Sequence, residues 1–365
     1  MPTTSFEYVL PVIRGIQAGR EYYVSMCPVR LLPKLLPLDD EEVPPQMRAG
    51  RSLNRSRIPE IASYILDNPK SYALSAIAAS IDADIKFEPI GTEAEGRKIG
   101  RLRVPMDARF TINDGQHRRA AFELALKQNP DLGYETIALI LFLDIGLEHS
   151  QQIFTDLNRY SVHPDTSLNI LYDRRDKQAN LVRAIIKEVK VFRTLTDMER
   201  SNLTARSGKL FTLSNVYNAT LALLANHQDS EIEQQIALAS AYWNAVSSYI
   251  PDWEQVLQRQ VSASEMRRDY VHSHAIALAG LGAVGATLLS VYPESWESHL
   301  EGLQEIDWSR SNRDWQGRIF SSGGISKSRT SVSLMSAYIK KFLNLPLSLE
   351  EEKLENACIS GGRGK

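Results

Sequence analysis

The chain has 365 residues, of which 43% are hydrophobic and 24% charged, so it can form a sizeable core and wholesale disorder is excluded. Its 42 Lys and Arg against 44 Asp and Glu give a net charge of −2. This balance excludes a globally basic, histone-like DNA binder but allows a local basic face. Two distant cysteines, Cys27 and Cys358, are too few for a thiolate metal centre or a disulfide framework, so we expect a cytoplasmic protein.

Short β-type and helical segments alternate over residues 1–165, which predicts an α/β (α+β) domain. Strands are predicted at 6–13, 21–27, 74–81, 100–104, 109–113 and 137–144, and helices at 58–66, 118–128 and 149–158. The proline-rich stretch 28–50 is predicted to be an irregular connector. The continuous apolar run at 137–144 is typical of a strand buried on both faces.

Helical segments replace this alternation in the second half, so we expect an all-α domain over 166–350. The predicted helices cover 178–193, 213–227, 230–249, 252–260, 269–291 and 329–344. Residues 351–365, which end in small and polar residues, are predicted to be a flexible tail.

The apolar run 275–291 holds several glycines and follows a charged segment, which favours a buried helix over a membrane span. Within it, Gly280-Leu-Gly-Ala-Val-Gly285 has the spacing of a dinucleotide-binding fingerprint. That fingerprint requires a preceding strand, and here a predicted helix surrounds it. We therefore interpret these glycines as positions of close helix packing.

The densest group of functional residue types is Ile112-Asn-Asp-Gly-Gln-His-Arg-Arg119, where a predicted strand leads through a glycine into a helix. A helix N-terminus attracts anions, and Gly115 lets the backbone approach a phosphate closely. His117 and Arg118 add charge-assisted donors. We expect a phosphate-binding loop in which Asp114 orients a ribose or metal-bound group or acts as a base. The alternative is that Asp114 only caps the helix and the arginines are solvated.

Asp114-Gly115-Gln116-His117-Arg118 resembles the signature of the DGQHR-domain family, which is similar to the ParB/sulfiredoxin-like superfamily. Two further segments match that family in order, RSLNRSRIPEIASYI at 51–65 and IFTDLNRYSVHP at 153–164. The chain length, the N-terminal strand pair, the segment Tyr270-Val-His-Ser-His274 and the helical second half extend the resemblance to the DndB family.

This resemblance implies a bacterial cytoplasmic protein that represses the DNA phosphorothioate modification operon by binding double-stranded DNA at its promoter. In the wider superfamily the matching loop binds nucleotide phosphates, which implies ATP or CTP with Mg²⁺. The residues that would hold the nucleotide are Asp114, Gly115, Gln116, His117, Arg118, Arg119 and Asn158. Gln116 stands where sulfiredoxin has its catalytic cysteine, so a reductase of that type is not expected.

Two basic stretches are candidate DNA contacts. Four arginines lie between positions 48 and 57 with no acid among them, and segment 309–331 mixes cations with serines and aromatic side chains. Arg, Lys, Ser and backbone N–H groups are the usual phosphate contacts, and aromatic rings add stacking. Solvated surface loops are the alternative. The expected DNA-binding residues are Arg51, Arg55, Arg57, Arg310, Arg313, Arg318, Lys327 and Arg329.

Three functions are left open, of which a DNA-binding regulator is favoured. We expect it to be a homodimer, because operators are often two-fold symmetric, and to have other DNA-sulfur-modification proteins as partners. The second is a nucleotide-binding switch or hydrolase with Asp114 and His117 as catalytic residues. A metal-dependent nuclease built on Asn113, Asp114 and His117 ranks last. No metal site and no membrane contact are expected.

Overall fold

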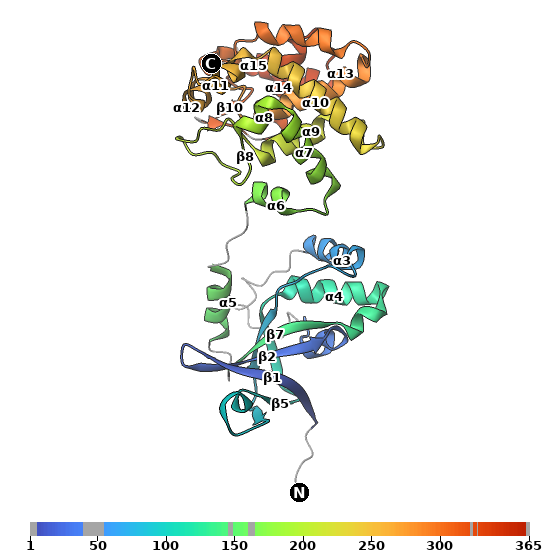
Figure 1. The fold of residues 1–365 in the computed structure, drawn as a ribbon, viewed down its shortest axis with the longest axis vertical. Helices are drawn as coiled ribbons and strands as arrows, with labels where there is room; N and C mark the ends of the chain where they lie inside the picture. The colour runs from blue at the N-terminus through green and yellow to red at the C-terminus, as the bar shows by residue number, and fades with distance from the viewer. Residues whose placement is uncertain are drawn as a thin grey trace. The chain divides into compact units, whose positions relative to one another are not determined.

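The computed structural model describes residues 6–38, 55–144, 149–159, 165–321, 324–326 and 328–362. The chain divides into two compact units, Met1–Val162 and His163–Lys365, drawn in Figure 1. Each unit has its own cluster of buried apolar side chains.

The first unit is built on a seven-stranded sheet of order β4-β5-β1-β2-β7-β3-β6, in which only β3 and β7 pair in parallel. Sequence reasoning predicts every strand except β4, which is a short edge strand with no apolar alternation. The strands are β1 (Glu7–Gln17), β2 (Arg20–Pro28), β3 (Ile77–Asp82), β4 (Lys86–Pro89), β5 (Ile99–Pro105), β6 (Arg109–Asp114) and β7 (Thr136–Leu143).

Helices cover both faces of this sheet unequally. Alternate strand residues such as Ile77, Ile112 and Leu139 enter the core with α3 (Arg57–Asp67) and α4 (Gln116–Gln128). The opposite face carries α5 (Ser150–Arg159), which contacts β6 (Figure 1). The connector after β2 contains the 3-10 turn η1 (Val29–Leu31) and the short helix α1 (Leu32–Leu35). Two further 3-10 turns are η2 (Ala94–Arg97) and η3 (Pro130–Tyr134).

β7 does not have the two buried faces that its apolar run predicts. Ile137, Leu139 and Leu141 are buried, whereas the residues between them are partly exposed. Only the alternate residues enter the core with α3 and α4, so an unbroken apolar run here has one buried face.

The second unit is mainly helical, and it also contains two short sheets that the expectation of an all-α domain does not include. β8 pairs with β9 in parallel, and β10 pairs with β11 antiparallel. Two-residue strands are too short to show a periodic pattern. The elements are α6 (Thr166–Tyr172), α7 (Lys177–Glu188), α8 (Lys190–Leu195), β8 (Thr196–Asp197), β9 (Phe211–Thr212), α9 (Leu213–Leu223), α10 (Ile232–Ser248), α11 (Pro251–Leu257), α12 (Ala263–Asp269), α13 (Ala275–Val291), η5 (Trp296–Glu305), η6 (Arg313–Trp315), β10 (Phe320–Ser321), β11 (Gly324–Ile325), α14 (Arg329–Phe342) and α15 (Leu349–Gly362).

Helix α13 is the buried helix that the sequence predicts, and it packs against α9 and α14. A Cβ on Gly282 would lie 2.2 Å from the carbonyl oxygen of Ala219, and one on Gly280 would lie 2.5 Å from the side chain of Met335. These glycines therefore allow close helix packing, as interpreted. Within the described residues, none of the helices has the length and apolar character that a membrane crossing requires.

The predicted helix 269–291 is interrupted, because α12 ends at Asp269 and α13 begins at Ala275. The intervening loop holds one buried histidine, His272, and one partly buried histidine, His274. The Nδ1 atom of His272 accepts a hydrogen bond from the indole N–H of Trp253 at 3.1 Å, and His274 Nε2 bonds the carbonyl oxygen of Arg267 at 2.8 Å. Burial lowers the pKa of both rings, so they are neutral packing residues.

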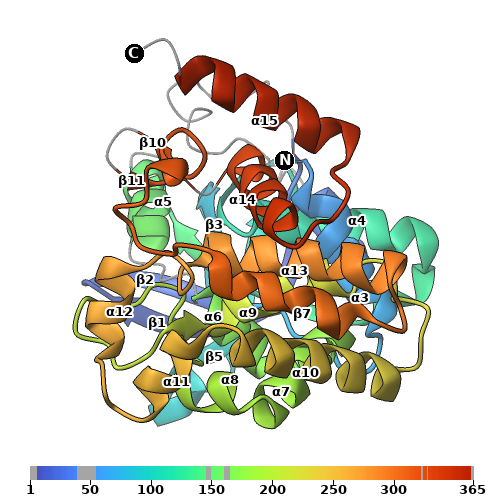
Figure 2. The same ribbon diagram turned by 90° about the horizontal axis from the view of Figure 1, so that it is seen from above.

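The predicted tail is wrong over most of its range, because residues up to Gly362 form α15. Glu351 accepts hydrogen bonds from the ammonium of Lys340 at 2.9 and 2.8 Å. Glu355, which is 2% exposed, pairs with Arg318. These ion pairs hold α15 against α14 (Figure 2). Because charged rather than apolar side chains make the contact, the sequence shows no apolar face here, and the segment is predicted to be a tail.

Candidate functional site

The motif forms the predicted strand–turn–helix. β6 ends at Asp114, Gly115 adopts a left-handed conformation with φ of 101°, and α4 begins at Gln116. A Cβ on Gly115 would lie 3.0 Å from Arg118 Nη2 and 3.0 Å from Ile77 Cγ1. Both the backbone conformation and the available space therefore require glycine here.

Arg118 closes this turn. Its Nη2 donates to Asp114 Oδ2 at 2.7 Å and to the carbonyl oxygen of Ala76 at 2.9 Å. The side chain is 19% exposed, and its Nε is buried with no hydrogen-bond partner among the described residues. Arg118 and Asp114 thus bind each other, whereas the sequence prediction treats both as ligand-binding groups.

Arg119 is not part of the loop surface, which corrects its predicted role in nucleotide binding. It is 3% exposed and donates from Nε to the carbonyl oxygen of Leu36 at 2.7 Å and from Nη2 to that of Pro33 at 3.2 Å. It also pairs with Glu123. This arginine anchors the connector after β2 to α4.

His117 and Arg57 come together, although the sequence places them in separate candidate sites. Helix α3 packs against α4, and the nearby charge of Arg57 contributes to the pKa of His117. Partial burial, followed by the charges of Arg57 and Arg118, lowers that pKa below its ordinary value of 6.5. Arg55 and Arg57 are both exposed.

The N-terminus of α4 is favourable for an anion. None of the described side chains caps it, and its first turn contains no acidic residue. The first N–H groups of a helix have no intrahelical acceptor and carry a partial positive charge. Beside them lie the positive charge of Arg57 and the ring of His117, which its lowered pKa leaves mostly neutral near pH 7 but still able to donate a hydrogen bond.

The remaining predicted residues divide into two groups. Arg51 and Lys327 lie outside the described residues, as does the side chain of Asn158, whose backbone belongs to α5. The others belong to the segment 309–331.

In that segment Arg318 is corrected as a DNA contact, because its Nε and Nη2 bind both oxygens of Glu355 at 2.9 and 2.8 Å. Arg310 lies over the ring of Phe320 at 5.3 Å, and Arg313 and Arg329 are exposed. The segment therefore keeps Arg310, Arg313 and Arg329 as candidate contacts.

The described residues show no group of three or more His, Cys, Asp or Glu that could hold a metal ion. Asp114 is a single carboxylate already bound to Arg118, so the loop fits phosphate groups better than Mg²⁺. The nuclease alternative gains no support from this donor set.

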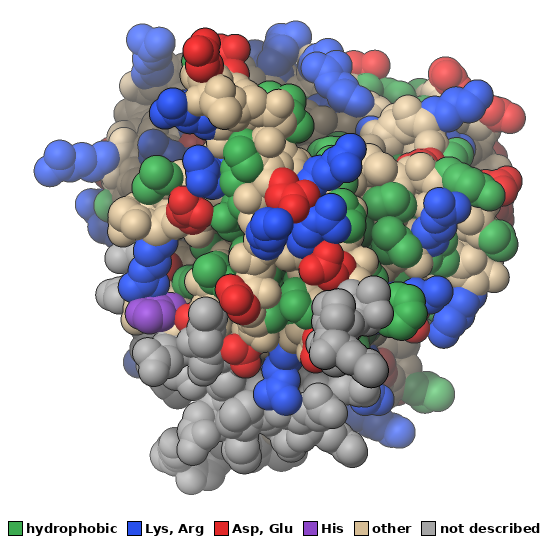
Figure 3. Space-filling model, turned by 90° about the horizontal axis from the view of Figure 1, so that it is seen from below, with side chains coloured by type: hydrophobic (Ala, Val, Ile, Leu, Met, Phe, Trp, Pro, Cys, Tyr) green, Lys and Arg blue, Asp and Glu red, His purple; other side chains and the backbone are tan. Residues whose placement is uncertain are grey.

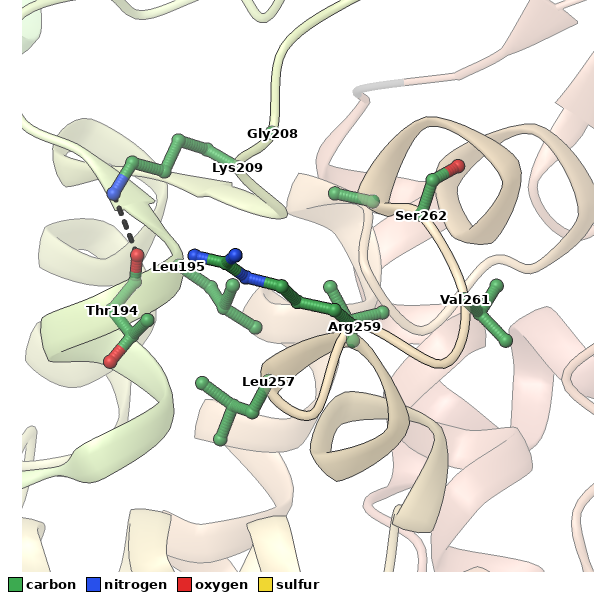
Figure 4. A pocket seen from close by; sticks show the side chains of 10 residues that line it. Thr194, Leu195, Gly208, Lys209, Leu257, Arg259, Val261 and Ser262 are labelled. Carbon is green, nitrogen blue, oxygen red and sulfur yellow. Dashed lines mark hydrogen bonds between the residues drawn. The ribbon is translucent and has the colours of Figure 1, made fainter.

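Sequence reasoning misses a pocket of about 580 Å³ in the second unit, where Lys209 and Arg259 are the charged lining residues (Figure 4). The two residues belong to no motif and are far apart in the chain. The fold brings them together, and the positive φ of Arg259, which it shares with three other non-glycine residues, is likewise not visible in the sequence.

The comparisons with known proteins give one match. No curated protein and no solved structure matches the chain. The family model of DndB, described as DNA-sulfur modification-associated, matches residues 10–346 and so extends over both units. The chain therefore belongs to the DndB family of DNA-sulfur-modification-associated proteins.

Proposed function

We propose that the protein is a DNA-binding transcriptional repressor of the DNA phosphorothioate modification operon. The family match supplies the context of DNA sulfur modification. The observation that carries the DNA contact is the position of exposed Arg57 beside His117 at the uncapped N-terminus of α4, with exposed Arg55 two residues before Arg57 in the chain.

This arrangement suits a phosphate backbone. Helix N-termini and arginines are both common donors to phosphate oxygens, and arginine binds phosphate with two donors at once. The contact must be local, because the net charge is −2. On the face drawn in Figure 3, outside the grey atoms, acidic and basic side chains are interspersed, so that face offers no continuous basic surface.

Anisotropy titrations of labelled promoter duplex at several salt concentrations test the proposal. Each phosphate contact adds about 0.9 to the slope of log affinity against log salt. The double variant Arg55→Ala/Arg57→Ala should therefore lower the slope by about 2 and weaken binding. Lys70→Ala/Lys127→Ala removes the same charge from exposed positions beyond α3 and at the far end of α4, and should leave the slope unchanged.

Two results would contradict DNA binding at this place. One is the absence of salt-sensitive binding at low ionic strength, and the other is an equal slope in wild type and the arginine variant. Repression is read separately from a reporter under the operon promoter. Its expression should rise in cells that carry the arginine variant and stay low with the lysine variant.

A nucleotide-binding switch or hydrolase is the second candidate, and the left-handed Gly115 beside the uncapped α4 N-terminus favours it. Gly115, Gln116 and His117 would hold the phosphates. Calorimetric titration with ATP and CTP tests this, using Asp114→Ala, His117→Ala and Arg118→Ala. Weaker binding by His117→Ala supports the loop, whereas equal heats from wild type and all three variants remove it.

The proposal has three further parts. The first unit would be a ParB/sulfiredoxin-like DGQHR domain over residues 1–165, followed by the helical domain. The protein would act as a homodimer on a two-fold symmetric operator. It would work in the bacterial cytoplasm, where the promoter lies.

The homodimer has its own test. Light scattering of the protein with and without promoter duplex measures the stoichiometry, and one chain per duplex would contradict the dimer.

A further inference from the structure

The pocket in the second unit combines an apolar wall with positive charge. Figure 4 shows it between α8 and the loop that joins α11 to α12. Its only charged lining residues among the described part of the chain are Lys209 and Arg259. A volume of about 580 Å³ lies in the range of small-molecule sites. The apolar lining residues are Leu195, Val256, Leu257, Val261 and Ala263.

Arg259 occupies a backbone position that glycine normally fills. Helix α11 ends in a Schellman motif, in which the N–H of Gln260 bonds the carbonyl oxygen of Gln255 at 2.9 Å and the N–H of Arg259 bonds that of Val256 at 3.1 Å. In this motif the residue that donates the second of these bonds is left-handed, and Arg259 accordingly has φ of 59°. This turn of the chain directs the Arg259 side chain over the pocket, as Figure 4 shows.

The guanidinium of Arg259 is available to a ligand. Arg259 is exposed, and its side chain forms no ion pair or hydrogen bond with any described residue. Figure 4 shows its side chain extended across the pocket toward the side on which Lys209 and Thr194 lie. Five N–H donors are thus presented above an apolar wall, with no acid lining the pocket to neutralise them.

The Lys209 side of the pocket is held in place. Lys209 Nζ donates to the carbonyl oxygen of Thr194 at 2.6 Å, which uses one of its three donors. Arg267 donates to the backbone carbonyl oxygens of Thr204 at 2.9 Å and Ser207 at 3.0 Å, and to that of Lys209. This arginine fixes the loop that carries Lys209, so the site exists before a ligand binds.

We propose that this pocket binds a small organic anion, whose anionic group lies between Lys209 and Arg259 and whose apolar body packs on the wall of leucine and valine side chains. A carboxylate on an acyl chain and a phosphate on a nucleotide share this chemistry. Charge-assisted hydrogen bonds supply affinity for the head group, and burial of the apolar body adds to it.

Fluorescence titration of the full chain with 1-anilinonaphthalene-8-sulfonate, an aromatic anion, tests the site without DNA. Wild type should bind one equivalent with saturation. Arg259→Gly and Lys209→Met should each weaken that binding about tenfold or more, the effect of losing a charged hydrogen bond. Arg206→Ala removes an exposed charge from the same loop outside the pocket and should bind as wild type does.

Arg259→Gly separates ligand binding from folding, because glycine suits the left-handed position. It should unfold at the same temperature as wild type or higher. The neutral analogue N-phenyl-1-naphthylamine should bind wild type and Arg259→Gly equally. Unchanged affinity of Arg259→Gly for the anionic dye, or binding that does not saturate, would overturn the proposal.

Competition then identifies the ligand class. Displacement of the dye by decanoate assigns the pocket to acyl carboxylates, and displacement by AMP assigns it to nucleotide phosphates. Displacement by neither overturns the proposal. Because no DNA is present, any of these results leaves the DNA-binding proposal to its own test.

Discussion

Arg118 and Arg119 are adjacent in the motif and have different structural roles. Arg118 folds back over Gly115 to pair with Asp114, whereas Arg119 is buried and binds the carbonyl oxygens of Leu36 and Pro33. The direction of each side chain from the first turn of α4 decides this division, and the sequence shows only two neighbouring cations. His117 is the motif side chain that lies beside Arg57.

Gly115→Ala tests how tightly this turn is specified. The substitution forces alanine into φ of 101° and pushes Cβ against Arg118 and Ile77. We expect the free energy of unfolding of the first unit to fall by about 2 kcal/mol or more. Urea unfolding monitored by circular dichroism measures this loss. Gly19→Ala, with φ of 76° and open space around Cβ, should cost only about 1 kcal/mol.

Equal losses in the two alanine variants would show that backbone conformation alone matters at Gly115. Tryptophan fluorescence supplies an internal reference, because all five tryptophans lie in the second unit and their transition should not move.

At the scale of the element, α15 is held by ion pairs. Glu351 and Glu355 lie one helical turn apart and face Lys340, Lys341 and Arg318. Burial tends to raise the pKa of each carboxyl, but the hydrogen bonds from these cations outweigh it, and both pKa values lie below the ordinary 4.5. Carboxylates with lowered pKa stabilise the folded state only while they are ionised.

The stabilisation from these two carboxylates should be complete above pH 4.5 and lost as pH falls through their lower folded pKa values. Glu355→Gln should weaken this pH dependence and cost about 3 kcal/mol at pH 7, because it removes the ion pair of the largely buried Arg318, whereas Lys341 is exposed and loses little. Urea unfolding followed by tryptophan fluorescence measures both. Glu352→Gln, at an exposed position of the same helix, should behave as wild type, and an equal effect of the two variants would contradict the docking role.

At the scale of the whole molecule, the net charge of −2 is the sum of regions whose local charges differ. Opposite charges are paired at the surface, as in Arg103 with Glu7 and Glu88, and around α15. The α4 N-terminus differs, because exposed Arg57 lies there beside His117 with no acid in the first turn of α4. DNA binding by a protein of net charge −2 depends on such a local excess.

Promoter affinity should rise as pH falls from about 7.5 to 5.5. His117 has a pKa below 6.5 in the free protein, and a phosphate beside it would raise that pKa. Binding would then take up to one proton, which amounts to at most about a tenfold gain per pH unit. Anisotropy titrations at constant ionic strength measure the slope. His117→Gln should flatten it, and a slope unchanged in that variant would exclude His117 from the interface.

The sequence by itself determined the local structure of both units and the family. Period-two and period-3.6 patterns locate most strands and helices, because each element buries one face, and the Asp114–Arg118 segment carries a family signature. Only the tertiary structure decided which cationic side chains are buried or paired with a carboxylate and which stay exposed to a ligand. It pairs Arg318 with Glu355, buries Arg119 and brings Arg57 to His117. Each of these outcomes depends on contacts between residues distant in the chain, which local periodicity does not encode.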